Sequence, residues 1–335
     1  MTPDPSSYTI GWITALPIEL AAATIMLDKE YDAPYMDGQD ITPYTFGRMG
    51  RDNVVIACLP GGQTGLSAAT AAAIHMRNMF KSIEHRFMVG IGGGVPSEKD
   101  DIRLGDVVIS LPTEGHGGVV QYDFGKAEAD GRFRPTGHLN TPPKLLLNVV
   151  NQARCNLFLG RSQHALHLAK FGQVFSRSSA GPDILFQATY NHAGGSTCKG
   201  CKSDMLVERQ TRKYQEPSDG ASSVKIHFGT IASGNKVIKD ARTRDEISEQ
   251  LGGHILCFET EAAGLMNDFP CLVVRGICDY ADSHKQDNWQ GYAAATAAAY
   301  TKELVSLISS AHVSSLMPFR PSDHVPSTGI SKEGQ

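Results

Sequence analysis

The sequence predicts an α/β fold in which helices cover both faces of a mostly parallel or mixed sheet. Two observations predict it. Apolar strand-like runs alternate with stretches of helical periodicity, and these runs are continuously apolar rather than alternating with polar residues. A chain of 335 residues, of which 41% are hydrophobic, can bury one large core or two smaller ones.

Most predicted elements lie in the two ends of the chain. β-branched and aromatic runs indicate strands, whereas Ala-rich or periodic segments without a breaker indicate helices. The short strands 42–50 and 53–61 are joined by "GRD", which is typical of a hairpin. In chain order we expect strand 8–16, helix 18–29, strands 42–50 and 53–61, helix 65–80, strands 86–95 and 104–112, strand 224–234, helix 241–251, and helix 290–310.

The pattern is looser between residues 112 and 222. This segment contains a helical stretch at 142–153 and a Gly/Ser/Cys-rich stretch at 191–204. We expect it to be an elaborated insertion or cap on the core. The end of the chain, 312–335, is rich in Pro, Ser and Gly and is expected to be disordered.

Composition excludes some classes of function. The net charge is −4 and the sequence has no basic cluster, so we expect no nucleic-acid partner. No run of about 18 apolar residues and no signal-peptide pattern occurs, so we expect no membrane partner and a cytoplasmic location. Several of the seven cysteines lie in apolar runs and are interpreted as buried, reduced thiols.

A glycine cluster, "VGIGGGV" at 89–95, ends a predicted buried strand. Glycines there let a ligand approach the backbone, but a tight crossing of strand and loop explains them equally well. The spacing matches neither a dinucleotide-binding loop nor a P-loop, because Val95 and Pro96 follow and no Gly-Lys-Ser/Thr occurs.

Four acidic residues are candidates for chemistry. Glu19 lies in the first turn of a helix, where it either complements the helix dipole or sits at a ligand-binding strand end. Glu259 and Glu261 are two residues apart and, in an extended chain, would point the same way, as a pair of ribose hydroxyls requires. Asp279 ends an apolar strand, where burial favours a protonated acid. Alternatively, Arg275 pairs with one of these acids and the others are solvated.

A Cys-x-x-Cys pair near a histidine raises the question of a metal. His192, Cys198 and Cys201 offer three ligands of the kind that zinc prefers. Four ligands are usual, and no second pair of ligands lies nearby in the sequence. We therefore expect neither a metal nor a cofactor, and the role of these three residues stays open.

Five motifs in order resemble one family. "TALPIEL", "VGIGGGVPSEKDDIRLGDVVIS", "ASGNKVIKD", "CFETEAAGL" and "VVRGICDYAD" are similar to the nucleoside phosphorylase and nucleosidase superfamily. The exact residues within these motifs resemble those of fungal members, which occur alone or fused to NACHT and ankyrin-type modules. The match covers 8–112 and 224–310. It implies a single domain over 8–311, a three-layer α/β/α sandwich with a mixed, partly barrel-like sheet, and a homo-oligomer.

The resemblance also implies roles for individual residues. Asp279 matches the acid that protonates purine N7, Glu261 the carboxylate that holds the ribose hydroxyls, and Glu19 the carboxylate that activates water. The remaining matches border the substrate: Glu259 beside the ribose clamp, Gly92 and Gly93 near base and sugar, and Asn235, Val237, Ile238 and Cys278 around the purine. Val237 and Ile238 replace the usual aromatic residue, and Cys278 replaces a small hydroxyl residue.

Departures from the family pattern favour water over phosphate as the nucleophile. Phosphorylases of this superfamily bind phosphate through arginines, whereas this chain has Glu19 near the first and Met88 at the second of these places. A carboxylate there would repel phosphate by several kcal/mol. Arg86, two residues before Met88, keeps phosphorolysis open.

We therefore expect a purine nucleosidase that hydrolyses the N-glycosidic bond of adenosine, inosine or guanosine to free base and ribose, as in purine salvage. Its partners would be the nucleoside and water. A phosphate-dependent purine nucleoside phosphorylase is one alternative. A module that senses nucleosides or nucleotides without turnover is the other.

Overall fold

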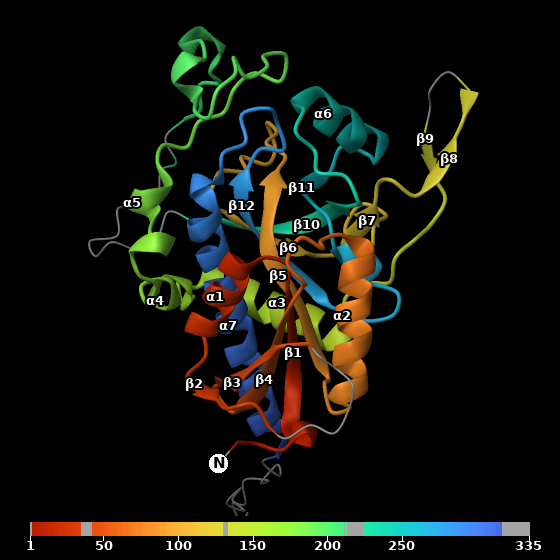
Figure 1. Cartoon of the computed structure of the whole chain (residues 1–335), viewed down its shortest axis with the longest axis vertical. Helices are drawn as coiled ribbons and strands as arrows, with labels where there is room; N and C mark the ends of the chain where they lie inside the picture. The colour runs from red at the N-terminus through yellow and green to blue at the C-terminus, as the bar shows by residue number, and fades with distance from the viewer. Residues whose placement is uncertain (1, 35–41, 130–132, 211, 213–223, 317–335) are drawn as a thin grey trace, which may run out of the picture.

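The structure is a computed structural model that describes residues 2–34, 42–129, 133–210, 212 and 224–316. Its centre is a mixed sheet, as predicted (Figure 1). From one edge to the other the strands are β11 (Ile255–Glu259), β10 (Ile226–Ser233), β6 (Val107–Ser110), β12 (Leu272–Asp279), β5 (His85–Gly94), β1 (Tyr8–Thr14), β4 (Asp52–Cys58), β3 (Tyr44–Met49) and β2 (Lys29–Tyr31). Strands β4, β1, β5 and β12 run parallel to one another, and β3 and β4 form the predicted hairpin.

One half of the sheet closes on itself. β11 pairs with β10 and also runs antiparallel to β5, with Cys257 opposite Gly94 and Phe258 opposite Gly93. Strands β11, β10, β6, β12 and β5 therefore form a ring, while β1 to β4 extend as an open sheet. This closure confirms the partly barrel-like sheet that the sequence resemblance implied.

Helices cover both faces because the buried strands are apolar on both sides. In β1, Ile10 and Trp12 belong to the core with α1 (Pro17–Ile25) and α7 (Gln290–Leu316), whereas Ile13 packs on the other side with α2 (Leu66–Met79). Figure 1 shows α1 and α7 on one side and α2 on the other. Gly276 of β12 has no room for a Cβ, which would lie 1.8 Å from the carbonyl oxygen of Ala293 in α7. The three-layer arrangement is thus confirmed.

The segment 112–222 contributes partly to this core. β7 (Val119–Gln121) pairs with β10, and the apolar face of α3 (Lys144–Phe158) packs in the same core as α7. The other elements lie outside the sheet: the ribbon β8 (Gly125–Ala127) and β9 (Phe133–Pro135), and helices α4 (His164–Leu168) and α5 (Arg177–Ala180). The segment is therefore more than the expected insertion or cap, because its strand β7 extends the sheet and its helix α3 belongs to the core that contains α7.

The remaining helix is α6 (Ala241–Gln250), at its predicted place. At the C-terminus, α7 runs to Leu316 instead of ending near residue 310, so the predicted tail cannot begin at 312. The rest of that predicted tail, 317–335, lies outside the described residues. Within the described part of the chain, no helix is both long and apolar enough to cross a membrane.

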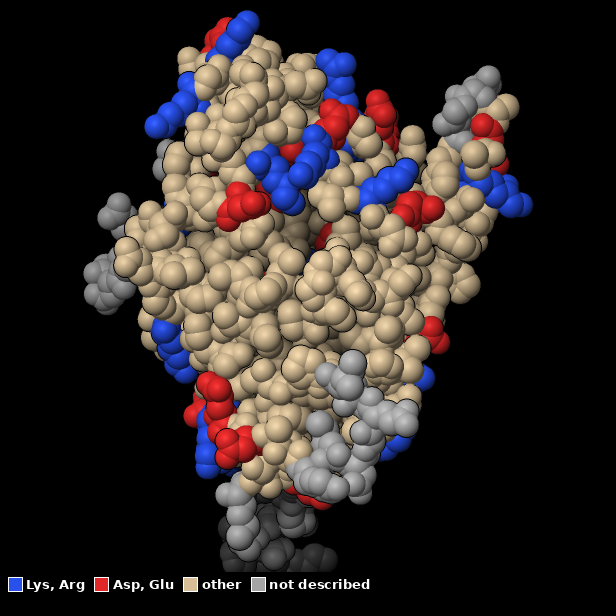
Figure 2. Space-filling view, viewed as in Figure 1, with Lys and Arg blue, Asp and Glu red and all other residues tan. Residues whose placement is uncertain are grey.

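Charges on the face shown in Figure 2 are mixed. Lys and Arg side chains lie among Asp and Glu side chains, and acidic atoms are visible in a hollow bordered by basic side chains. This face shows no continuous basic surface of the kind that would bind a nucleic-acid backbone.

Candidate active site

An acid-lined cavity of about 180 Å³ lies at the carboxyl ends of several parallel strands, where α/β sheets bind ligands. Asn235 is not among its lining residues; its side-chain oxygen accepts a hydrogen bond from Leu66 N at 3.2 Å instead. The cavity brings together nearly all of the residues expected from the sequence, namely Glu19, Gly92, Gly93, Val237, Ile238, Glu259, Glu261, Cys278 and Asp279.

Glu19 is held in place by backbone amides from two strand ends. It follows β1 directly, in the first turn of α1. Its Oε2 accepts hydrogen bonds from the N–H groups of Ala15 (2.7 Å) and Leu16 (2.9 Å), and its Oε1 accepts one from Ile91 of β5 (2.8 Å). The two interpretations of this residue therefore combine, because the carboxylate that caps the helix start also lines the cavity.

One buried arginine is surrounded by three carboxylates. Arg275 of β12 is fully buried, forms an ion pair with Glu259, and lies 3.5 Å from Glu261. A Cβ added at Gly90 would lie 2.4 Å from both Arg275 Nη1 and Glu19 Oε1, so this glycine leaves room for both side chains. Three acids and one guanidinium leave this part of the cavity with an excess of acidic groups.

Burial acts on the acids of this cluster. It raises the pKa of Glu19, although the charge of Arg275 and the three amides oppose that rise. Burial likewise raises the pKa of Glu261, again opposed by Arg275. A carboxylate with a raised pKa is a stronger base near neutral pH.

Glu259 and Glu261 differ in how many of their acceptor sites are used. Besides its ion pair, Glu259 accepts hydrogen bonds from the N–H groups of Glu261 (3.1 Å) and Ala262 (3.0 Å). Glu261 accepts one from Gly65 N (3.2 Å) and one from the Thr260 hydroxyl (2.5 Å). Glu259 is thus mainly occupied in shaping the turn after β11. The second oxygen of Glu261, with only the long contact to the arginine, is free to bind a ligand.

Asp279 is part of an ion pair. Its Oδ2 lies 2.9 Å from Lys285 Nζ and accepts a hydrogen bond from Cys278 Sγ (3.0 Å), and its Oδ1 accepts one from Ala281 N (2.8 Å). Burial disfavours a charged lysine, but Asp279 outweighs burial and raises the pKa of Lys285. Burial raises the pKa of Cys278 well above its usual value, so it acts here as a thiol donor.

The glycines of β5 permit both sheet closure and the approach of the acid. A Cβ at Gly92 would lie 2.4 Å from Cys257 Sγ, across the junction with β11. A Cβ at Gly93 would lie 2.8 Å from Asp279 Oδ1. The sequence left a tight crossing and a backbone open to a ligand as alternatives; the structure shows the tight crossing, and the same glycines line the cavity.

Some cavity residues carried no clear signal in the sequence. Lys285 follows Asp279 by six residues, and only the turn after β12 brings the two together. Arg86, the residue that kept phosphorolysis open, lies near the start of β5, about 20 Å along the strand from Gly92. Its guanidinium stacks over the ring of Phe269, 4.9 Å from the ring centre, and it is not a lining residue. Other lining residues that sequence reasoning did not single out include Thr64, Lys236, Phe258 and Gln290.

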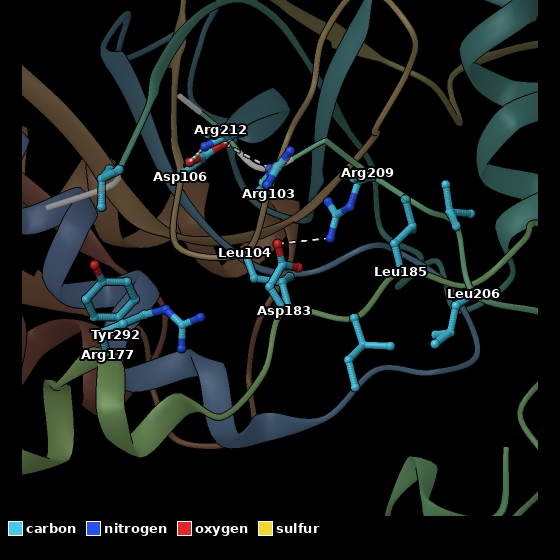
Figure 3. Close-up of a pocket in the computed structure, with 13 residues that line it drawn as sticks. Arg103, Leu104, Asp106, Arg177, Asp183, Leu185, Leu206, Arg209, Arg212 and Tyr292 are labelled. Atoms are coloured by element: carbon cyan, nitrogen blue, oxygen red, sulfur yellow. Dashed lines mark hydrogen bonds and ion pairs between the residues drawn. The ribbon is translucent and has the colours of Figure 1, made fainter. Parts of the chain in front are cut away.

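A second cavity, of about 430 Å³, is larger but poorer in available chemistry (Figure 3). Its two acids are both paired with arginines, Asp183 with Arg209 at 2.9 Å and Asp106 with Arg212 at 2.6 Å. A carboxylate engaged in this way is a poor general base, so the acid-lined cavity is the stronger candidate for a functional site.

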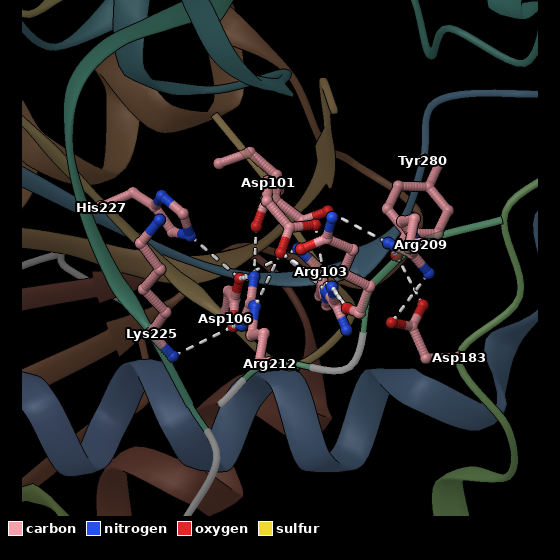
Figure 4. A network of polar contacts seen from close by, with 11 residues as sticks. Asp101, Arg103, Asp106, Asp183, Arg209, Arg212, Lys225, His227 and Tyr280 are labelled. Atoms are coloured by element: carbon pink, nitrogen blue, oxygen red, sulfur yellow. Dashed lines mark hydrogen bonds and ion pairs between the residues drawn. The ribbon is translucent and has the colours of Figure 1, made fainter. Parts of the chain in front are cut away.

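The polar network beside the second cavity is structural (Figure 4). Asp106 precedes β6 and accepts hydrogen bonds from Arg212, from His227 Nε2 on β10 (2.9 Å) and from Lys225 N (3.0 Å). Burial alone would raise the pKa of Asp106, but Arg212 and His227 lower it below its usual range. Because its partners lie on β10 and on the segment before it, this acid fixes the start of β6 against β10.

Comparisons with known proteins agree with this architecture. The family model described as "Phosphorylase superfamily" matches residues 9–310. A nucleotide-binding leucine-rich repeat (NLR)-like protein of Hyaloscypha variabilis is 44% identical over 91% of this chain and 30% of its own length. The ATP nucleosidase Cap17 of Escherichia coli is 24% identical over 87% of this chain and 50% of its own length. The chain therefore spans half or less of these two relatives.

A solved structure shows the same fold at low identity. The 5′-methylthioadenosine/S-adenosylhomocysteine nucleosidase of Neisseria meningitidis, in complex with methylthio-immucillin-A, superposes with a TM-score of 0.56 at 16% identity. It covers 89% of this chain, and this chain covers 98% of it. The likeness extends over nearly all of that enzyme.

Proposed function

Since this chain belongs to the phosphorylase superfamily, we propose that it is a purine nucleosidase, which uses water to cleave the N-glycosidic bond of a ribonucleoside into free base and ribose. The superfamily contains both hydrolases and phosphorolytic enzymes, so the choice of nucleophile depends on the site itself.

The observation that carries the proposal is the cluster of Glu19, Glu259 and Glu261 around the single buried Arg275. A phosphate dianion placed beside these acids would be repelled by several kcal/mol in a cavity of low dielectric constant. Water carries no charge and can donate a hydrogen bond to a carboxylate. Among the described residues that line the cavity, the only cations are Lys236 and Lys285, and the latter is paired with Asp279.

Each group then has a defined step. Glu19, anchored by three amides, accepts the proton of the water whose oxygen attacks C1′ of the ribose. Glu261 accepts hydrogen bonds from ribose hydroxyls as positive charge develops on the sugar. The Asp279–Lys285 pair supplies the proton to N7, so that the bond to C1′ breaks and the base departs neutral.

Adenine is our first choice of base. One relative is named an ATP nucleosidase, and the similar solved structure is a nucleosidase of two adenine nucleosides. The side chain of Lys236 is exposed at the cavity, where its charge favours a substrate with a phosphorylated 5′ end. Adenosine and ATP therefore both belong among the substrates to be tested.

The alternatives make different predictions. A phosphorylase would need phosphate and would release ribose 1-phosphate, but Arg86 lies too far away to bind that phosphate. A sensor would bind without turnover, a role compatible with an NLR-like relative three times as long as the match. The anchored Glu19 favours turnover, since binding alone requires no base.

The deciding experiment measures base release from adenosine, inosine, guanosine and ATP, with and without phosphate. Without phosphate, we expect release of the free base and of a sugar product that carries a hydroxyl group rather than a phosphate at C1′. Asp279→Asn should lower the rate of base release at least about a hundredfold. Asp268→Asn, a change at an exposed acid, should be as active as the parent. Strict dependence on phosphate, or tight binding with no base release, would contradict the proposal.

A further inference from the structure

Three residues outside the acid-lined cavity form a cluster of metal-binding type. His192, Cys198 and Cys201 each offer one donor atom, and these three atoms all lie within 4.8 Å of one another. Tetrahedral zinc, with bonds of about 2.3 Å to sulfur and 2.0 Å to nitrogen, places its donors roughly 3.7 Å apart. The cluster is therefore close to the size of a zinc site, and small side-chain rotations would complete it.

The local backbone prepares these donors. Cys198–Gly200 is a single 3-10 turn in which Cys201 N donates to Cys198 O at 3.0 Å, so both sulfurs stay together. Nδ1 of His192 accepts a hydrogen bond from Gly194 N at 3.0 Å, and a zinc ion bound at this nitrogen would displace that hydrogen bond. All three side chains are partly buried. Two thiolates would neutralise one divalent zinc ion.

The surroundings supply an outer layer of contacts. Gln286 Nε2 donates to Cys198 Sγ at 2.8 Å, as amide groups do to ligating thiolates. The ring of His284 lies 5.4 Å from that of His192, and its buried Nε2 has no hydrogen-bond partner among the described residues. This nitrogen is a candidate for a fourth ligand, and a water molecule is the alternative.

The loop that carries the cluster contacts a second part of the chain. His192 N donates to Ser283 Oγ at 3.0 Å, and Phe186 stacks on His284 at 4.0 Å between ring centres. Ser283, His284 and Gln286 belong to the turn after β12 that also carries Lys285, the partner of Asp279. A metal here would therefore hold the 186–201 loop against the turn that positions the acid.

We propose that His192, Cys198 and Cys201 bind a structural zinc ion that fixes the 186–201 loop to the turn after β12. Soft sulfur ligands with one imidazole select zinc over magnesium or calcium. The site lies outside the acid-lined cavity and takes no part in the hydrolysis, so its test does not depend on the proposed activity.

The test uses the full chain and measures bound metal directly. Elemental analysis of the purified protein should find about one zinc per chain. His192→Ala and the double variant Cys198→Ser/Cys201→Ser should lose it. Cys155→Ser, which removes an exposed cysteine on α3, is the matched control and should retain it. Gln286→Ala should weaken zinc binding about tenfold or more, because it removes only the outer contact.

A second measurement covers the possibility that the double variant fails to fold. The parent protein, stripped by a chelator and reloaded with Co²⁺, should show the absorption of tetrahedral cobalt with thiolate ligands. Its 186–201 loop should exchange amide hydrogens faster without metal than with zinc. Absence of zinc with binding weaker than micromolar, zinc retained after loss of both cysteines, or a Cys198–Cys201 disulfide in place of metal would each overturn the proposal.

Discussion

The ammonium group of Lys285 lies 2.9 Å from Oδ2 of Asp279, so the acid expected to protonate the base is paired with a cation. We expect Lys285→Met to lower kcat at least about tenfold with a smaller change in KM, because the pair acts on the departing base rather than on binding. Steady-state kinetics of base release would measure both constants.

Lys239→Met is the control for this substitution, since it removes an exposed lysine that is not among the residues lining the acid-lined cavity. It should leave kcat and KM unchanged. A Lys285→Met enzyme with the kcat of the parent would show that Asp279 acts without this partner.

The acid limb of the pH profile should report on Glu19. Burial raises its pKa, and the carboxylate required as a base is present above that raised pKa and lost as the pH falls through it. The limb of kcat/KM should therefore have its midpoint above 4.5, the ordinary value for glutamate. Glu19→Gln should reduce activity about a hundredfold or more and abolish this limb.

Two comparisons test the assignment of that limb. Glu249→Gln, at an exposed site on α6, should leave it unchanged. Glu261→Gln should raise KM and keep the limb, although burial raises the pKa of Glu261 as well. If the limb persists in Glu19→Gln, another group is the base.

Removal of Arg275 should destabilise the fold. The substitution Arg275→Met leaves Glu259, Glu261 and Glu19 buried without their shared cation, and breaking a buried pair in this way costs about 3–5 kcal/mol. Denaturation by urea would measure the loss in the free energy of unfolding. Arg242→Met, on the exposed side of α6, should change it by no more than about 0.5 kcal/mol. A loss below about 1 kcal/mol would mean that the acids protonate instead.

A methyl group at Gly93 should disturb the acid directly. The Cβ of Gly93→Ala would lie 2.8 Å from Asp279 Oδ1 and 2.9 Å from Ala281 Cβ, so the turn must move. We expect a loss of roughly a hundredfold in kcat and of about 1–3 kcal/mol in stability, measured by kinetics and thermal unfolding. Gly61→Ala, whose Cβ would meet nothing within 4 Å, should be neutral in both. Full activity of Gly93→Ala would contradict this close approach.

Local pattern was enough to predict the elements that position the site. Continuous apolar runs predicted strands β1, β5 and β12, because a strand buried on both faces needs apolar residues at every position. The tail was less predictable. Residues 311–316 extend α7 although their composition suggested the end of the helix.

The local sequence pattern did not predict which side chains of the site face the cavity. Asn235 belongs to a motif that lines the cavity at Val237 and Ile238, yet its own side chain binds the amide of Leu66 instead. Which side chains of a loop point into a cavity depends on contacts with distant residues. Sequence spacing does not contain that information.

The sequence by itself determined which chemical groups the protein carries and at which strand ends they lie: Glu19 after the first strand, glycines at the end of β5, Glu259 and Glu261 at and just after the end of β11, and Asp279 at the end of β12. Tertiary structure decided how they are paired. Glu19 binds an amide 72 residues away, on the strand that pairs with β1, and Glu261 binds one 196 residues away, at the start of α2. Two groupings of shorter range, Lys285 with Asp279 and His192 with its two cysteines, depend instead on the conformation of a single turn or loop. Pairing between distant residues depends on the packing of the whole sheet, which no local periodicity encodes.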